Sequence, residues 1–76
     1  MAEFLLEIVR RIVADPGAVS VEEVERDGDA VLRLTVAEDD RGKVIGRQGR
    51  IIRSLRTLVR AGGAREGKRY LLEIAE

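Results

Sequence analysis

The segment Gly46-Arg47-Gln48-Gly49 contains the residue types in this sequence that are best suited to hold a phosphate. Glycine has no Cβ, so a phosphate backbone can approach the chain closely at both ends of the segment. A helix that follows such a turn presents unpaired N–H groups, and its dipole favours an anion there. Between the glycines, Arg47 can pair with a phosphate and Gln48 can hydrogen-bond a sugar or phosphate oxygen. The segment therefore predicts a cradle for a nucleic-acid backbone.

Basic residues surround this segment, although the formal net charge of the chain is zero. The balance is −7 over residues 1–40, +8 over residues 41–65, which contain no acidic residue, and −1 over residues 66–76. Because steering depends on the local field rather than on the total charge, this segregation favours an anionic partner over a merely solvated helix face. Apolar Val44, Ile45 and Leu34 could form a floor for bases beside the cations. The cations predicted to form the rim are Arg41, Lys43, Arg50 and Arg53.

Other glycine-rich motifs fit this sequence poorly. A P-loop needs four residues between its glycines and then Lys and Ser or Thr, whereas only two residues separate Gly46 from Gly49. A dinucleotide-binding fingerprint needs Gly-X-Gly-X-X-Gly directly after a strand, and Gly42, Gly46 and Gly49 have a different spacing. Many isolated Gly-X-X-Gly turns merely join two helices, so the surrounding elements decide the interpretation.

The first half of the chain predicts one helix and a pair of strands. Residues 3–14 carry apolar side chains at a helical period, and Pro16 ends the helix because proline disfavours the helical conformation in the residue before it. Residues 19–26 favour a strand, but Val24 falls out of the two-residue alternation, so a bulge or a late strand start is open. Residues 30–37 alternate regularly, and Asp27-Gly28-Asp29 is typical of a hairpin turn.

The second half predicts two helices and a strand. A short helix over 41–45 is capped by Asp39 or Asp40, and the glycine segment interrupts it. A second helix over 50–61 ends at Gly62-Gly63, since glycine is common just past a helix end. Residues 68–75 form the final strand, with Tyr70 expected as an ordinary sheet residue. The order helix-strand-strand-helix-helix-strand predicts an α+β fold, in which a three-stranded mixed sheet packs against three helices.

The composition excludes several classes of function. The chain has no cysteine and no histidine, so disulfides and the usual nucleophiles, general bases and zinc ligands are missing. We find no catalytic constellation, so we expect neither an enzyme nor a cofactor or metal site, and Glu22, Glu23 and Glu25 indicate a solvated strand edge. No apolar run reaches the roughly 18 residues of a membrane helix. The early acids Glu3 and Glu7 are wrong for a signal peptide, so we expect a cytoplasmic protein.

The block over residues 42–52 closely resembles the KH-domain signature, in which Ile-Gly-X-X-Gly-X-X-Ile joins two helices. The extra helix and strand before this block resemble the type II arrangement of KH domains. The whole chain, as a single KH domain over residues 1–76, is similar to the small bacterial stand-alone KH proteins of the KhpA (YlqC-like) family. KH domains clamp about four nucleotides over the Gly-X-X-Gly loop.

This resemblance implies a bacterial RNA-binding protein that binds single-stranded RNA. It also implies the role of an RNA chaperone. It implies a homodimer, or a heterodimer with a KhpB-type KH protein, and in some bacteria a role in cell elongation and cell-wall homeostasis. Single-stranded DNA is not distinguished from RNA at this point. The residues that match the RNA-contacting segment are Arg41, Gly42, Lys43, Val44, Ile45, Gly46, Arg47, Gln48, Gly49, Arg50 and Arg53.

Two hypotheses of different classes follow. In the first, the domain binds single-stranded RNA with an affinity dominated by phosphate contacts. In the second, it acts chiefly as a protein-interaction module through dimerisation, with weak nucleic-acid binding of its own. We expect Ile51 and Ile52 to belong to the core, and we interpret Arg56 and Arg60 as solvated helix residues rather than contacts.

Overall fold

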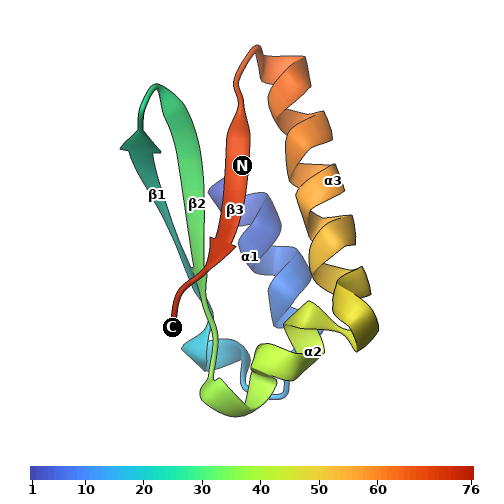
Figure 1. The fold of residues 1–76 in the computed structure, drawn as a ribbon. Helices are drawn as coiled ribbons and strands as arrows, with labels where there is room; N and C mark the ends of the chain where they lie inside the picture. The colour runs from blue at the N-terminus through green and yellow to red at the C-terminus, as the bar shows by residue number, and fades with distance from the viewer.

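The computed structural model describes residues 1–76 as one layer of strands that is covered on one face by helices (Figure 1). This architecture confirms the predicted α+β class, element order and mixed three-stranded sheet, and it agrees with a type II KH fold. No helix has the length and apolar character that crossing a membrane requires. The elements are α1 (Ala2–Arg10), β1 (Ser20–Arg26), β2 (Asp29–Thr35), α2 (Arg41–Ile45), α3 (Arg50–Glu66) and β3 (Tyr70–Ile74), with short 3-10 turns over Pro16–Ala18, Glu38–Asp40 and Arg47–Gly49.

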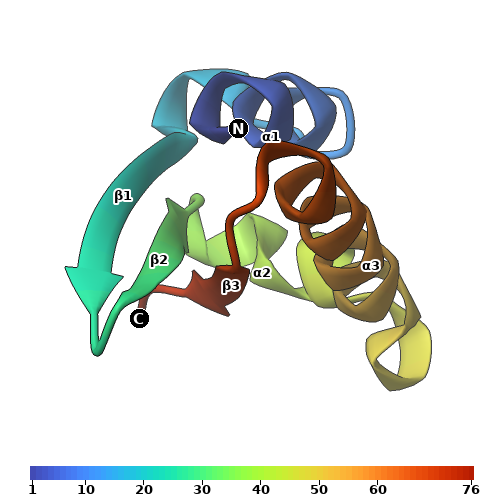
Figure 2. The ribbon, with the colours of Figure 1, turned by 90° about the horizontal axis from the view of Figure 1, so that it is seen from above.

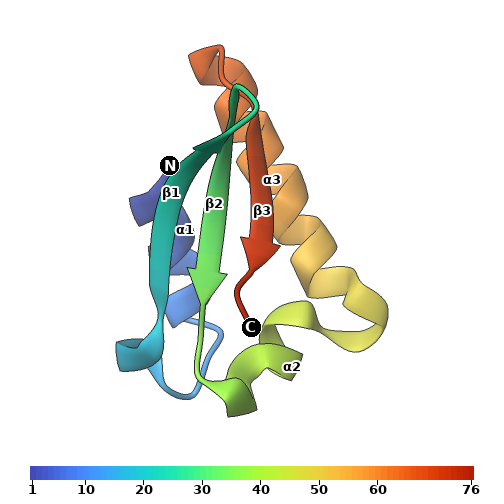
Figure 3. The ribbon, with the colours of Figure 1, turned by 60° about the vertical axis from the view of Figure 1, so that its left-hand side comes forward.

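The sheet has the order β1-β2-β3, with β1 antiparallel and β3 parallel to the central strand β2 (Figure 3). The register of β1 and β2 runs without interruption from Ser20 opposite Thr35 to Arg26 opposite Asp29, so no bulge occurs. Val24 breaks the alternation because it lies opposite Val31, on the face of β2 that points away from Leu32 and Leu34. The structure therefore shows no bulge, and β1 begins at Ser20, one residue after the predicted start, which does not account for Val24.

The hydrophobic core lies between the sheet and the three helices (Figure 2). The two largest fully buried side chains of β2, Leu32 and Leu34, form its centre, and Ile52 is buried as the sequence predicted. The buried residues of this cluster are Leu5, Val9, Val19, Leu32, Leu34, Val44, Ile52, Leu55, Val59, Tyr70 and Leu72.

Helix α1 ends at Arg10, four residues before the predicted end at 14. The N–H of Arg11 donates to the Ile8 carbonyl, which tightens the last turn. Further along the chain, the N–H groups of Ala14 and Asp15 donate to the Asp40 carboxylate, at 3.1 and 3.0 Å, and not to helix carbonyls. The prediction of a longer helix was wrong because these donors are satisfied by a distant side chain instead of helix carbonyls.

Helix α3 extends to Glu66, so the prediction that Gly62-Gly63 stops it was wrong. Both glycines lie inside the helix, where close packing requires Gly63. A Cβ at Gly63 would lie 2.6 Å from the Lys68 carbonyl oxygen and 2.7 Å from Tyr70 Cδ2. The helix is instead ended by Gly67, whose φ of 71° is left-handed.

Two smaller expectations also differ from the structure. The two later strands are shorter than predicted, because β2 ends at Thr35 and β3 spans only Tyr70–Ile74. Neither Asp39 nor Asp40 caps α2 through its side chain. The Asp40 carboxylate is 2% exposed and is occupied by the N–H groups of residues 14 and 15.

Candidate nucleic-acid interface

The segment between α2 and α3 is a sharp bend. At its first position, Gly46, the backbone adopts a conformation that only glycine tolerates. Gly46 has φ 76° and ψ 172°, a region that side chains do not tolerate. A Cβ there would lie 2.6 Å from Ile51 Cγ1, so the side chain of Ile51 occupies the space beside the bend. Gln48 and Gly49 follow with φ of 57° and 73°, and the Gly49 N–H donates to the Gly46 carbonyl at 3.1 Å. The chain then enters α3 directly.

The bend leaves its own side chains and the start of α3 open. Arg47 and Gln48 are both exposed, and no side chain caps the N-terminus of α3. The N–H groups of Gly49 and Arg50 already donate to the Gly46 and Arg47 carbonyls, so the donors that a ligand could use begin after Arg50, at the positive end of the helix dipole. The predicted cradle requires an anion to meet these donors beside Arg47.

Arg53 supports the bend from one turn further along α3. Its Nη2 donates to the carbonyl oxygen of Gln48, while the side chain stays exposed. This bond fixes the non-helical residue at the centre of the bend. Arg50 is exposed at the first position of α3, and its guanidinium makes no hydrogen bond or ion pair within the protein. Its carbonyl accepts a bond from the Ser54 hydroxyl.

Two cations of the predicted rim are held by the protein itself. The Arg41 guanidinium is half-buried and donates to the Ala75 carbonyl at 2.7 Å, so it links α2 to the end of β3. Lys43 Nζ lies 3.5 Å from Asp40 Oδ1 on the preceding turn, with the lysine exposed. These contacts orient both cations before any ligand arrives.

Asp40 fixes the start of α2. Hydrogen bonding from the Ala14 N–H holds the pKa of its carboxyl below the ordinary value; the Asp15 N–H and Lys43 act in the same direction, against the effect of burial. The ionised carboxylate therefore joins the segment after α1 to the helix that precedes the bend.

The apolar residues near the bend divide between core and surface. Val44 and Leu34 are both 0% exposed and belong to the core. Ile45 is 36% exposed at the last position of α2. Of the three residues considered as a floor for bases, Ile45 is therefore the one with an accessible side chain.

Two small cavities lie further along α3, beside β3. Arg56 Nε donates to the Leu72 carbonyl at 3.4 Å, and Arg56 and Arg60 line a cavity of about 100 Å³ with Tyr70, Leu71 and Leu72. Both arginines are exposed, as the interpretation of solvated helix residues expected, but the bond from Arg56 to Leu72 was not predicted. Their spacing of four residues on one helix face was the available signal, because it places both on the same side of α3.

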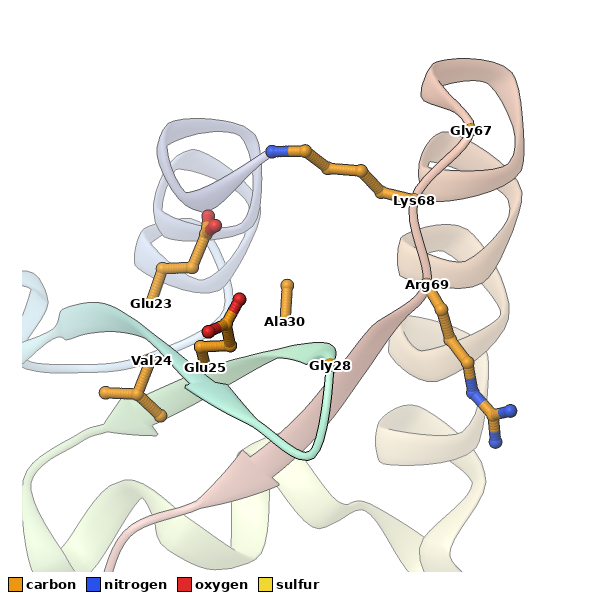
Figure 4. Close-up of a pocket in the computed structure, with 8 residues that line it drawn as sticks. All are labelled: Glu23, Val24, Glu25, Gly28, Ala30, Gly67, Lys68 and Arg69. Atoms are coloured by element: carbon orange, nitrogen blue, oxygen red, sulfur yellow. The ribbon is translucent and has the colours of Figure 1, made fainter.

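The largest cavity of the molecule lies at the opposite end, beside the β1–β2 turn (Figure 4). It encloses about 560 Å³ and mixes two carboxylates, Glu23 and Glu25, with Lys68 and Arg69. In Figure 4 the two glutamates rise from β1 toward the open space that Lys68 crosses. Carboxylates at this position disfavour an anion, so the cavity is a poor place for a phosphate backbone.

The acidic and basic parts of the molecule face apart. Figure 2 shows the bend between α2 and α3 on one side of the molecule and β1, which carries Glu22, Glu23 and Glu25, on the other. Residues 46–49 are exposed or half-buried and project away from the sheet. The predicted cradle therefore lies within the basic part of the molecule.

Comparison with known proteins agrees with this geometry. The model of the family described as "KhpA/KhpB, KH domain" matches residues 2–74. The chain belongs to this family. It is 43% identical to the RNA-binding protein KhpA of Caldanaerobacter subterraneus subsp. tengcongensis over 97% of this chain and 99% of that protein. It is 42% identical to the Listeria monocytogenes RNA-binding protein KhpA over the whole of both chains, and 45% identical to that of Treponema pallidum over 97% and 92%. The family is one of KH domains and not of enzymes, which agrees with the prediction from composition.

Proposed function

We propose that residues 1–76 act as one KH domain that binds single-stranded RNA in the cytoplasm through the bend between α2 and α3. The observation that carries the proposal is an exposed Gly-X-X-Gly bend that opens directly onto an uncapped helix N-terminus. The match to a KH-domain family and the relatives named as RNA-binding proteins support it. The phosphate backbone would lie over Gly46 and Gly49, with Arg47, Gln48 and Arg50 around it.

Substituting Arg47 and Gln48 together by Asp tests this proposal. Two anions at the cradle should weaken binding of a short single-stranded RNA by roughly tenfold or more, because like charges are placed against the phosphates. Circular dichroism should show an unchanged fold, since both side chains are exposed. Unchanged affinity in the folded double variant would remove the bend from the binding site.

A control of equal charge change separates this local effect from the total charge. Arg11→Asp with Ser20→Asp alters the net charge by the same amount at two exposed positions outside residues 41–65. This control should retain most of the affinity. Wild-type affinity should also fall with rising salt, as expected when phosphate contacts release counterions.

Family membership extends the proposal to a partner. We infer that the domain pairs with a second copy or with a KhpB-type KH protein, acts as an RNA chaperone, and contributes to cell elongation and cell-wall homeostasis. A surface between α1 and α3 supports pairing: Met1 packs on Gly62, and Phe4 and Leu58, one turn along each helix, flank this contact. Phe4 is 49% and Leu58 46% exposed, so each of the two helices offers a large apolar side chain to a partner.

The protein-interaction module remains the second candidate function, and this surface is the observation that favours it. Sedimentation of the wild type and of Phe4→Ser with Leu58→Ser should show a dimer that the double variant loses, while circular dichroism stays unchanged. A monomeric wild type at micromolar concentration would count against self-pairing. A tight dimer whose sedimentation does not change when RNA is added would favour the module over the RNA binder.

A further inference from the structure

Helix α2, which leads into the bend, is too short to hold its position alone. It has five residues, Arg41–Ile45, and Val44 is the only one that is buried. Isolated helices shorter than about 12 residues are marginal in water, so α2 depends on contacts with the rest of the fold. The bend follows α2 without a spacer, since the Gly46 N–H donates to the Gly42 carbonyl at 2.8 Å. Contacts that fix the start of α2 therefore also fix the bend.

Two neighbouring residues tie the start of α2 to different parts of the fold. The buried carboxylate of Asp40 accepts hydrogen bonds from the N–H groups of residues 14–15, which follow α1. The Arg41 guanidinium donates to the Ala75 carbonyl at 2.7 Å, just beyond the end of β3. That acceptor is itself held by the sheet, because the Ala75 N–H donates to the Leu34 carbonyl at 2.8 Å. One residue thus ties α2 to the segment after α1, and the next ties it to the sheet.

The surroundings of Arg41 are unsuited to a phosphate. Arg41 lines a cavity of about 500 Å³ together with two acidic residues, Glu38 and Glu76. None of residues 46–50, which form the bend and the start of α3, lines this cavity. Carboxylates beside a guanidinium disfavour a second anion there. The half-buried Arg41 is therefore placed to hold the protein together, unlike the exposed Arg47.

We propose that Arg41 serves RNA binding as a positioning residue. Its bond to the Ala75 carbonyl, with Asp40 as the tie on the other side, holds α2 in the orientation that presents the bend to the phosphate backbone. This role differs from the direct RNA contact that the sequence predicted for Arg41. The inference rests on the proposed function, because it concerns the same RNA site.

The salt dependence of RNA binding separates a positioning residue from a phosphate contact. Arg41→Met, Arg47→Met and Arg11→Met each remove one charge and keep an unbranched stem without a strong donor. In fluorescence anisotropy with a single-stranded RNA octamer, Arg47→Met should reduce the slope of log K against log salt by about 0.7, the value for one phosphate contact of a single strand. Arg41→Met should weaken binding about fivefold, the ratio that one hydrogen bond commonly supplies, with the wild-type slope. Arg11, exposed and outside residues 41–65, is the control whose loss should change neither quantity.

Hydrogen exchange reports on the bend itself. The N–H groups of Gly46 and Gly49 both donate to carbonyls within α2 and the bend. They should exchange faster in Arg41→Met than in the wild type, because α2 opens more often when its tie to the sheet is lost. The amides of β2 should keep their wild-type rates, which distinguishes this local effect from a general loss of stability. Circular dichroism establishes that each variant is folded.

A measurement on the wild type needs no variant. With ¹⁵N-labelled arginine, addition of the RNA octamer should shift the side-chain NMR signal of Arg47, which lies at the proposed phosphate cradle. The signal of Arg41 should stay in place, since its guanidinium remains on the Ala75 carbonyl in the complex.

The outcomes separate this inference from the proposed function. Wild-type affinity in folded Arg41→Met, a salt slope reduced as in Arg47→Met, or an Arg41 signal that moves with RNA as far as that of Arg47 would each overturn the positioning role while leaving RNA binding intact. A wild type that does not bind the octamer would overturn the proposed function, and the role of Arg41 with it. Weaker binding with an unchanged slope and faster exchange at the bend supports the assignment.

Discussion

Glycine pairs stand at both ends of α3, and the structure uses them in different ways. Gly46 and Gly49 precede the helix in a bend with positive φ, where we propose that the RNA backbone docks. Gly62 and Gly63 lie inside the last turns with helical geometry, where Met1 and the start of β3 pack against them. The first pair is needed for its backbone conformation, whereas in the second pair Gly63 is needed for its lack of a side chain. The same residue type therefore marks a site at one end and a close packing contact at the other.

The largest effect is expected from Gly63→Val. The new Cβ would meet the Lys68 carbonyl oxygen at 2.6 Å and Tyr70 Cδ2 at 2.7 Å, and the backbone atom cannot move aside easily. Overpacking of this kind should lower the free energy of unfolding by about 3 kcal/mol. Urea unfolding measures the change. A loss below about 1 kcal/mol would show that the turn into β3 yields at little cost.

Gly46→Ala should damage the other end of α3. The φ of 76° with ψ of 172° is essentially restricted to glycine, and Ile51 fills the space for a Cβ. The expected cost is about 2 kcal/mol of stability, with a loss of RNA affinity as the bend adopts another conformation. Urea unfolding and anisotropy measure the two effects.

Gly17→Ala is the matched control for this variant, because a Cβ at this exposed position would make only an ordinary contact, 3.6 Å from Asp15 Oδ1, and it lies outside residues 41–65. It should bind RNA like the wild type and should be no less stable. If the alanine at position 46 left both quantities unchanged, the bend would not depend on the backbone freedom of glycine.

Gly62→Ala should have a smaller effect and the opposite sign. The contact at this position is with the end of the flexible Met1 side chain, which can move aside. Alanine also has a helix propensity about 1 kcal/mol better than that of glycine. Thermal unfolding should therefore show a change between zero and a stabilisation of about 1 kcal/mol. A strong destabilisation would mean that Met1 is held as rigidly as the start of β3.

The smallest effect is expected from acid. Acid acts on Asp40, which precedes α2, the helix that leads into the bend before α3. Because the pKa of Asp40 is lowered in the folded state, its contribution is present at neutral pH and is lost as pH falls below about 4, the ordinary value for Asp. The pKa of Glu73 is also lowered, chiefly by its hydrogen bond with Arg26, so both groups favour folding above the same pH range.

Urea unfolding of the wild type and of Asp40→Asn at pH 7 and pH 3 separates the two groups. The Asn variant should be less stable at pH 7 and should lose less stability on acidification than the wild type. Equal losses would assign the acid sensitivity to Glu73 and its ion pairs instead of Asp40.

The sequence predicted the elements whose side chains follow one period. The regular alternation of residues 30–37 identified β2, and α2 was predicted with the bounds that it has in the structure. Errors arose where a distant residue decides the outcome. The end of α1 depends on Asp40, which lies 25 residues after Asp15, and the end of α3 depends on the space that Tyr70 leaves beside Gly63. Local propensity contains neither fact.

The candidate site was predicted to a similar degree. The bend itself, with exposed Arg47 and Gln48, follows from the sequence because glycine spacing and helix flanks are local features. The bond from Arg41 to Ala75 and the position of Arg56 beside Leu72 could not be predicted, because they depend on how α2 and α3 lie against β3. The bond from Arg53 to the Gln48 carbonyl depends on the non-helical conformation of Gln48. A charge pattern identifies a basic surface, while the packing decides which cation is held and which is free.

The parallel pairing of β2 with β3 has a consequence for how the chain acquires its structure. The β1–β2 hairpin joins neighbouring residues, but Ala30 pairs with Tyr70 only after the intervening helices have returned the chain to the sheet. Closing so long a connection costs entropy before the new contacts compensate for it, and such non-local pairing slows folding. The central strand therefore spends the early part of folding with one edge unpaired. During that interval the edge can pair with another nascent chain, and rapid formation of α3 shortens the exposure.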